Sequence, residues 1–378
     1  MMRSDSLING TLFVLMLGLV LLGLVMVLSS SQFMMLKNPD TNVYQFMGRQ
    51  LVRFSIGLAC FTYFATADYN QWERWARPIM VLNLLLLVLV LSPLGDSAKG
   101  AQRWLNVGFR FQPSDLTKIA VIFYLSAVWA ERREHLGAFF RGVFFPMALV
   151  SLTLGLILLQ PDHGTAFFIG VVAIALWFSA GGKIMHMVPG AVAFAGAIGA
   201  ALYAKPHLWQ RITAFMEPEK YANTKYYQVL QAKIGFAHGG LTGEGIGNGV
   251  QQLGFMPESH TDFIFAIIGE ELGFINCAIL IAAFLLIVLI GYWIAVRCEN
   301  PFGSLLCVGC ASAIGFQSAL NIAVVTGSVP TTGIALPFIS YGGSALIINM
   351  IMVGLMIRVA RETFDIEPST PASRRRAG

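Results

Sequence analysis

The sequence predicts an all-α polytopic membrane protein, a bundle of about ten transmembrane helices that forms one domain over residues 1–378. Composition is the first observation behind this prediction. Of the residues, 56% are hydrophobic and only 12% are charged, whereas about 25% are charged in an ordinary soluble domain. The second observation is that apolar runs long enough to cross about 30 Å of hydrocarbon as a helix, roughly 20 residues each, recur along the whole chain.

The expected spans are separated by mostly short polar connections. The first run lacks a small-residue cleavage motif, so it is expected to be a retained helix rather than a signal peptide. One connection, residues 205–260, is much longer and separates the seventh span from the eighth. In chain order, the spans are 9–29, 50–67, 75–93, 115–131, 141–160, 164–180, 184–204, 262–295, 302–326 and 340–360.

Basic residues predict the orientation. Ten spans place both termini on one side, and the short tail at 361–378 carries Arg374, Arg375 and Arg376. Lys and Arg close to membrane ends favour the cytoplasm, so both termini are expected there. Of the 12 Lys and Arg that this orientation places outside, nine lie in or just after two outer loops. Long loops are largely exempt from the rule, so these basic loops need a separate explanation.

Cysteine and histidine patterns predict no metal centre. Cys307 and Cys310 have a CxxC spacing but lie one turn apart in an apolar helix with no second pair nearby, so packing is expected. The six histidines are scattered without metal-ligand spacing.

The two basic outer loops contain candidate features. Residues 94–112 lead into a helix that starts near Pro113, where Asp115 and Lys118 are neighbours on one face; an exposed surface pair is the alternative. The second loop, residues 205–260, contains a short amphipathic helix, "YYQVLQAKIGFAHGG", and then a glycine-rich centre. Flexibility is favoured there over a phosphate cradle, because no strand precedes the glycines.

Irregular backbone is expected near the C-terminus. The stretch 326–344, "TGSVPTTGIALPFISYGGS", places Pro330 and Pro337 between two spans. Such backbone at membrane depth must be buried in protein or line a cavity, so a re-entrant segment is expected; an ordinary outer loop is the alternative. Gln317 and Asn321, one turn apart in the preceding span, are expected to join helices by hydrogen bonds.

Charges at the head of the eighth span need a reason. In "PESHTDFIFAIIGEELG", Asp262 begins a long apolar run, with Glu258 and His260 just before it. Charges in such places are costly and usually functional, although helix capping is an alternative. Asp262 and Glu270 are eight residues apart, about 80° around a helix, and so are not a facing pair. Asp162 in "QPDHGT" could cap the next helix or face the same cavity.

Several stretches resemble the SEDS family (shape, elongation, division and sporulation). They appear in the family's order and extend over nearly the whole chain, and ten spans with a long outer loop after the seventh is also the family's architecture. The matching stretches are "KGAQRW" (99–104), "FQPSDLTK" (111–118), "QPDHGT" (160–165), "PESHTDFIFAIIGEELG" (257–273) and "LPFISYGGSALI" (336–347).

The resemblance implies a peptidoglycan glycosyltransferase that polymerises lipid II at the outer face of the bacterial cytoplasmic membrane. It also implies a class B penicillin-binding protein as partner, with other membrane proteins of the division or elongation machinery, and no nucleic acid. Asp262 matches the acid that the family needs for catalysis. Polar positions of the family's central cavity are matched by Arg110, Asp115, Lys118 and Asp162.

Chemistry assigns further roles to these residues. Asp262 would act as general base on the acceptor's 4-hydroxyl, and the reaction would be a single displacement with inversion. Cations would offset the charge of the leaving pyrophosphate, with a divalent cation, Mg²⁺ or Mn²⁺, as a further candidate. The expected substrate-binding set is Arg103, Arg110, Asp115, Lys118, Asp162, Arg211, Lys233, Glu258 and His260.

Other functions and branches stay open at this point. A lipid II flippase would share the bundle and cationic loops but would not need Asp262 as a base; a non-catalytic scaffold for a penicillin-binding protein would use Asp262 only as a cap. The motifs favour the division branch over the elongation branch. The chain departs from the usual family pattern at Asp115 (usually Glu), His163 and Gly254.

Overall fold

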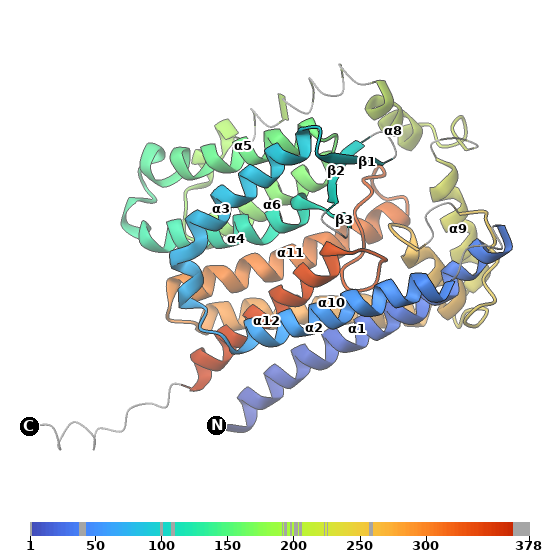
Figure 1. Ribbon diagram of the computed structural model, residues 1–378, viewed down its shortest axis with the longest axis horizontal. Helices are drawn as coiled ribbons and strands as arrows, with labels where there is room; N and C mark the ends of the chain where they lie inside the picture. The colour runs from blue at the N-terminus through green and yellow to red at the C-terminus, as the bar shows by residue number, and fades with distance from the viewer. Residues whose placement is uncertain are drawn as a thin grey trace, which may run out of the picture.

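The computed structural model describes residues 2–365 apart from a set of short gaps. Its elements form one elongated helical bundle, in which the long helices run roughly along the longest axis of the molecule (Figure 1). The residues outside the description are 1, 38–42, 99–100, 107–109, 191, 193–194, 197–198, 200–202, 204–205, 223, 225, 257–259 and 366–378.

The helices follow the predicted spans closely. Helix bounds are α1 (Met2–Lys37), α2 (Val43–Thr66), α3 (Asn70–Leu91), α4 (Pro113–Glu131), α5 (Phe145–Leu159), α6 (His163–Ser179), α8 (Pro206–Met216), α9 (Tyr227–Gly239), α10 (Ile264–Arg297), α11 (Pro301–Val325) and α12 (Ser344–Asp365). Short elements are η1 (Arg133–His135), η2 (Phe139–Phe144), which is a π-helical entry to α5, and η3 (Ile184–His186).

The membrane class is confirmed, but the count of ten spans is not. Nine of the predicted ranges coincide with a helix, whereas the seventh, 184–204, is interrupted by residues outside the description, although its described residues from 188 on are helical. Among the described residues, six helices are long and apolar enough to cross a membrane. The chain is a multi-pass membrane protein. The amphipathic helix predicted in the long loop is α9, whereas α8 was not predicted.

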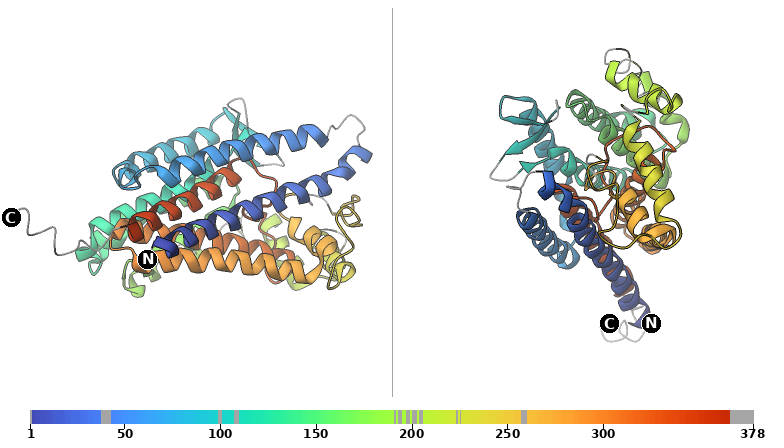
Figure 2. Two further views of the ribbon diagram at one scale, coloured as in Figure 1. Left: turned by 90° about the horizontal axis from the view of Figure 1, so that it is seen from below. Right: turned by 90° about the vertical axis from the view of Figure 1, so that its right-hand side faces the viewer.

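Helix α4 lies at the centre of the bundle. It is apolar on all sides, and side chains from Pro113 to Trp129 are almost all buried, as expected for a helix surrounded by others. It packs on α3, α6 and α11, while α10 packs on α11 and α2 packs along α12. The first turn of α1 and the last turn of α12 lie at the same end of the bundle (Figure 2).

A small antiparallel sheet, which was not predicted, lies at the other end. Its order is β1 (Gly95–Ala98), β2 (Ala101–Asn106) and β3 (Arg110–Phe111). Gly95 pairs with Leu105, and Leu105 pairs with Phe111 on its other side. The described part of the expected loop 94–112 therefore forms a sheet that packs on α3 and α4.

The long helix α10 is kinked at Gly273. Its φ is +78°, which favours glycine. A Cβ at this position would lie 2.4 Å from the amide nitrogen of Gly243, in the glycine-rich loop. The amide of Phe274 donates to the carbonyl of Gly240 (2.9 Å), so the kink docks the loop onto α10.

Gly23 allows α1 to touch the irregular chain between α11 and α12. A Cβ at Gly23 would lie 2.7 Å from Cα of Ile339 and 2.8 Å from its carbonyl oxygen, both of them backbone atoms. Because the backbone cannot move aside cheaply, Gly23→Ala is expected to lower the free energy of unfolding by about 1–3 kcal/mol. Thermal unfolding in detergent measures this loss.

Gly18→Ala is the matched control. Gly18 is on the same helix but exposed, and nothing lies within 4 Å of the Cβ that would be added. Its replacement is expected to leave stability unchanged or slightly raised, because alanine favours helix. Equal unfolding temperatures for the two variants would contradict the close approach of α1.

Candidate active site

The site is built around the broken segment, residues 326–343, which joins α11 to α12. Most of it is neither helix nor strand, yet Leu336, Phe338 and Ile339 are almost fully buried. Irregular backbone of this kind is tolerated at membrane depth where protein encloses it. Burial of these three side chains agrees with the predicted re-entrant or cavity-lining segment.

Asp262 lies beside this segment in a turn that precedes α10. The helix starts at Ile264, its N-cap residue is Phe263, and no side chain caps it. Asp262 is half-buried, and its Oδ1 accepts a hydrogen bond from Oγ1 of Thr261 (2.9 Å). A Cβ on the exposed Gly333 would be 3.9 Å from the other carboxylate oxygen. The capping alternative is therefore not what the structure shows.

The backbone of this turn is fixed by the broken segment and α11. Nδ2 of Asn321 donates both to the carbonyl of Asp262 (2.7 Å) and to that of Ile334 (2.8 Å). Oγ of Ser340 donates to the carbonyl of Thr261 (2.6 Å), and the amide of Tyr341 donates to the carbonyl of His260 (2.9 Å). Asp262 is thus held in place through the main chain of its turn.

Asn321→Leu tests this clamp. Two carbonyl groups lose their donor, which is expected to lower the free energy of unfolding by about 1–3 kcal/mol. A shift of Asp262 by about 1 Å is expected to reduce turnover about 10²-fold. Turnover and thermal unfolding are measured on the same purified variant.

Ser318→Ala is the control for that variant. Ser318 lies one turn earlier on α11, is equally buried, and its hydroxyl donates only to the carbonyls of Ile314 and Gly315 in its own helix. It is expected to retain turnover. If Asn321→Leu retains it too, the clamp does not position Asp262.

Asp115 and Lys118 form a buried ion pair on α4. Nζ of Lys118 is 2.9 Å from Oδ1 of Asp115, and both side chains are about nine-tenths buried. Oγ of Ser344 donates to Asp115 (2.6 Å), and Lys118 donates to Oε1 of Gln317 (3.4 Å), whose amide nitrogen donates to the carbonyl of Ala335 (2.9 Å). The pair therefore contacts the first residue of α12 and, through Gln317, the middle of the broken segment. The alternative of an exposed surface pair is wrong.

Asp162 and Arg103 form a second pair. Asp162 is the N-cap of α6 and accepts a hydrogen bond from the amide of Thr165 (3.3 Å). Nη1 of Arg103, on β2, lies 3.8 Å from its carboxylate, and Nε donates to the carbonyl of Gln160 (3.0 Å). Asp162 therefore caps a helix, and it also holds a cation of the sheet.

Arg211 and Lys233 reach the broken segment from the long loop. Nη1 of Arg211, on α8, donates to the carbonyl of Thr331 (3.2 Å). Nζ of Lys233, on α9, donates to the hydroxyl of Tyr226 (3.0 Å), and its stem packs against Gly327. Both side chains are exposed.

Electrostatics places Arg211 close to two other predicted residues. Desolvation lowers the pKa of its guanidinium, the neighbouring Arg103 lowers it too, and the carboxylate of Asp262 raises it. The guanidinium stays protonated at neutral pH because its ordinary pKa is so high. Arg211 is therefore within electrostatic range of both Asp262 and Arg103.

The other predicted residues are placed only in part. His260 is buried, with its ring edge-on to Tyr341 at 5.7 Å between centroids. The backbone of Arg110 lies in β3, but its side chain and the whole of Glu258 lie outside the described residues. Asn321 and Gln317 were predicted only to join helices. In the structure they donate hydrogen bonds to carbonyl groups that are distant in the sequence.

The described residues do not build a site for a resident metal. In the described part of the chain, no three His, Cys, Asp or Glu side chains converge closely enough to hold an ion. The acids nearest the broken segment are instead engaged with Lys118, Arg103 and Thr261.

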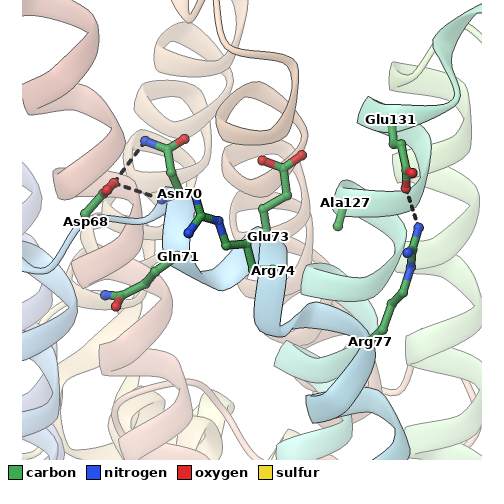
Figure 3. A pocket seen from close by; sticks show the side chains of 8 residues that line it. All are labelled: Asp68, Asn70, Gln71, Glu73, Arg74, Arg77, Ala127 and Glu131. Carbon is green, nitrogen blue, oxygen red and sulfur yellow. Dashed lines mark hydrogen bonds and ion pairs between the residues drawn. The ribbon is translucent and has the colours of Figure 1, made fainter.

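A polar pocket of about 380 Å³ lies between the start of α3 and the end of α4 (Figure 3). It is at the opposite end of α4 from Asp115, where Glu131 pairs with Arg77 of α3. Asp68 accepts hydrogen bonds from Asn70 in the same wall. None of the predicted site residues lines this pocket.

Comparisons of the sequence with known proteins identify one family. Residues 10–364 match the FtsW, RodA and SpoVE family model, described as "Cell cycle protein". A Trichlorobacter lovleyi protein named "Probable peptidoglycan glycosyltransferase FtsW" is 38% identical over 92% of both chains. The "Stage V sporulation protein E" of Bacillus subtilis is 36% identical over 93% of this chain and 96% of its own.

Solved structures give the same result. A chain from a peptidoglycan synthase complex, described for its structural coordination of polymerization and crosslinking, matches with a TM-score of 0.75 and 27% identity over 93% of this chain and 97% of its own. The rod shape determining protein RodA of Thermus thermophilus matches with a TM-score of 0.67 and 27% identity over 93% and 96%. This chain belongs to the FtsW, RodA and SpoVE family, the SEDS family, and is FtsW-like.

Proposed function

We infer that this chain is a peptidoglycan glycosyltransferase that polymerises lipid II into glycan strands during cell division. The observation that carries the inference is Asp262. Its main chain is fixed by Asn321, it caps no helix, and its half-buried carboxylate stands next to exposed Gly333 and close to Arg211. A carboxylate built in this way suits a general base.

The reaction uses that base once per bond. The 4-hydroxyl oxygen of the acceptor sugar attacks the anomeric carbon of the donor, and its proton passes to the carboxylate of Asp262. The bond between the anomeric carbon and the phosphate oxygen breaks, and the lipid pyrophosphate leaves with the electron pair. One displacement inverts the anomeric centre.

The leaving pyrophosphate needs positive charge nearby. Arg211 and Lys233 are exposed and contact the broken segment at Thr331 and Gly327, respectively. No described carboxylate forms an ion pair with either side chain. Fixed cations stabilise charge that develops in a transition state. We assign this role to Arg211 and Lys233, with Lys118 as a buried support.

The proposal also covers location and partner. We place the chain in the bacterial cytoplasmic membrane with both termini inside, so that the Asp262 end faces outward, where lipid II is displayed. A class B penicillin-binding protein is the proposed partner, since a structural relative comes from a complex that coordinates polymerization and crosslinking. Other membrane proteins of cell division would assemble with the pair.

Strand synthesis from labelled lipid II tests the function. The purified chain, with a class B penicillin-binding protein whose transpeptidase is blocked, is expected to make glycan strands. Lipid II translocation in liposomes without strand synthesis would support a flippase instead. Neither activity, in a folded protein with its partner present, would leave a scaffold.

A further inference from the structure

Arg53 on α2 is a cation that the assignment above does not use. It lies ten residues into the helix and is half-buried. Its guanidinium carbon is 4.7 Å from the centre of the Tyr341 ring, and Nη1 donates weakly to Oε1 of Gln50 (3.4 Å). Throughout the described residues, no carboxylate forms an ion pair with Arg53. A half-buried charge with no acid partner is costly to keep near a membrane.

The stack joins Arg53 to the Asp262 turn. Tyr341 donates its amide hydrogen to the carbonyl of His260 and packs its ring against the His260 ring. Ser340, the residue before it, holds Thr261. Arg53 is therefore connected, through Tyr341, to His260 at the start of the turn that contains Asp262.

Arg211 approaches from elsewhere on the broken segment. It contacts Thr331, on the stretch that brings Gly333 to Asp262, whereas Arg53 contacts the opposite end of the segment at Tyr341. The two cations come from α8 and α2. They are two separate positive positions along the broken segment, which lies beside Asp262.

Transfer between two lipid-linked sugars requires two such positions. The donor loses its pyrophosphate, and the acceptor keeps its own as the link to its lipid. A planar guanidinium binds phosphate oxygens in a bidentate manner, and a ring beneath it fixes its plane. We propose that Arg53, held over Tyr341, binds a second lipid pyrophosphate, separate from the one at Arg211 and Lys233; this rests on the proposed glycosyltransferase function.

Binding of a polyprenyl pyrophosphate tests the proposal without turnover. The full chain carrying Asp262→Asn is titrated, and stoichiometry is read by native mass spectrometry in detergent. Two equivalents are expected to bind. Adding Arg53→Gln is expected to remove one, and Arg53→Lys is expected to retain it with weaker affinity. Two equivalents with Arg53→Gln would overturn the proposal.

Kinetics provides a second readout in the otherwise unchanged chain. Arg53→Gln is expected to raise the KM for lipid II about tenfold or more, the usual effect of losing a hydrogen bond to a charged group. Arg297→Gln is the matched control, because Arg297 stacks on Trp293 at 4.0 Å in the last turn of α10, far from Asp262. Its KM is expected to stay unchanged.

Different results would overturn the Arg53 site and the glycosyltransferase function. Thermal unfolding confirms that each variant is folded before it is compared. Strand synthesis by the wild type with an unaltered KM in Arg53→Gln would overturn the Arg53 site and keep the glycosyltransferase. No strand synthesis by the wild type would overturn the glycosyltransferase, while the binding stoichiometry would still report on Arg53.

Discussion

Replacing Asp262 with Asn is expected to reduce strand synthesis about 10²–10⁴-fold, the usual contribution of a general base. The amide has nearly the same shape but cannot accept the proton of the acceptor hydroxyl. Because the carboxylate caps no helix and Asn321 binds the main-chain carbonyl rather than the side chain, the free energy of unfolding is expected to change little. Turnover of labelled lipid II and thermal unfolding measure the two effects.

Asp262→Glu separates charge from position. The longer side chain keeps a carboxylate but displaces it by roughly one bond, and such displacements cost catalysis heavily. Partial turnover is expected. If Asn and Glu at position 262 both retained full turnover, the base would be another group.

Lys118→Met is expected to have the second largest effect, this time on stability. The change leaves the Asp115 carboxylate buried, with the Ser344 hydroxyl as its side-chain donor among the described residues. Breaking a buried ion pair from one side costs about 3–5 kcal/mol. Denaturation in detergent is expected to show that loss of stability. Strand synthesis is also expected to fall, because Gln317, which donates to the carbonyl of Ala335 in the broken segment, loses its hydrogen bond from Lys118.

The double variant Asp115→Leu with Lys118→Met is the test of cause. Removing both charges leaves no buried unpaired ion, so stability is expected to recover much of the loss. The activity is not expected to recover with it. A double variant that is less stable than Lys118→Met alone would show that the pair is not the source of the effect.

The helices could be predicted because an apolar run long enough to span hydrocarbon is a strong local signal. The sheet could not, because strands of four, six and two residues carry almost no periodic pattern. Their pairing depends on packing against α3 and α4. The helix α8 was missed for a similar reason, since a polar loop surrounds it in the sequence.

The site was predictable in its chemistry but not in its connections. Asp262 and the pair of Asp115 with Lys118 stood out as charges beside apolar runs. The clamp from Asn321 did not, because its acceptors lie 59 and 13 residues away along the chain. Arg53 was missed because a single arginine near the start of an apolar run resembles an ordinary interface residue, whose charge reaches water.

The most direct test of the base assignment compares binding and chemistry in Asp262→Asn. Affinity for lipid II and the rate of the first glycosidic bond are measured on the same folded protein with its blocked partner. If Asp262 is the base, affinity stays near that of the wild type and the rate falls by about 10²–10⁴-fold. Loss of affinity that accounts for the whole loss of rate would contradict the assignment, because Asp262 would then bind substrate rather than take its proton.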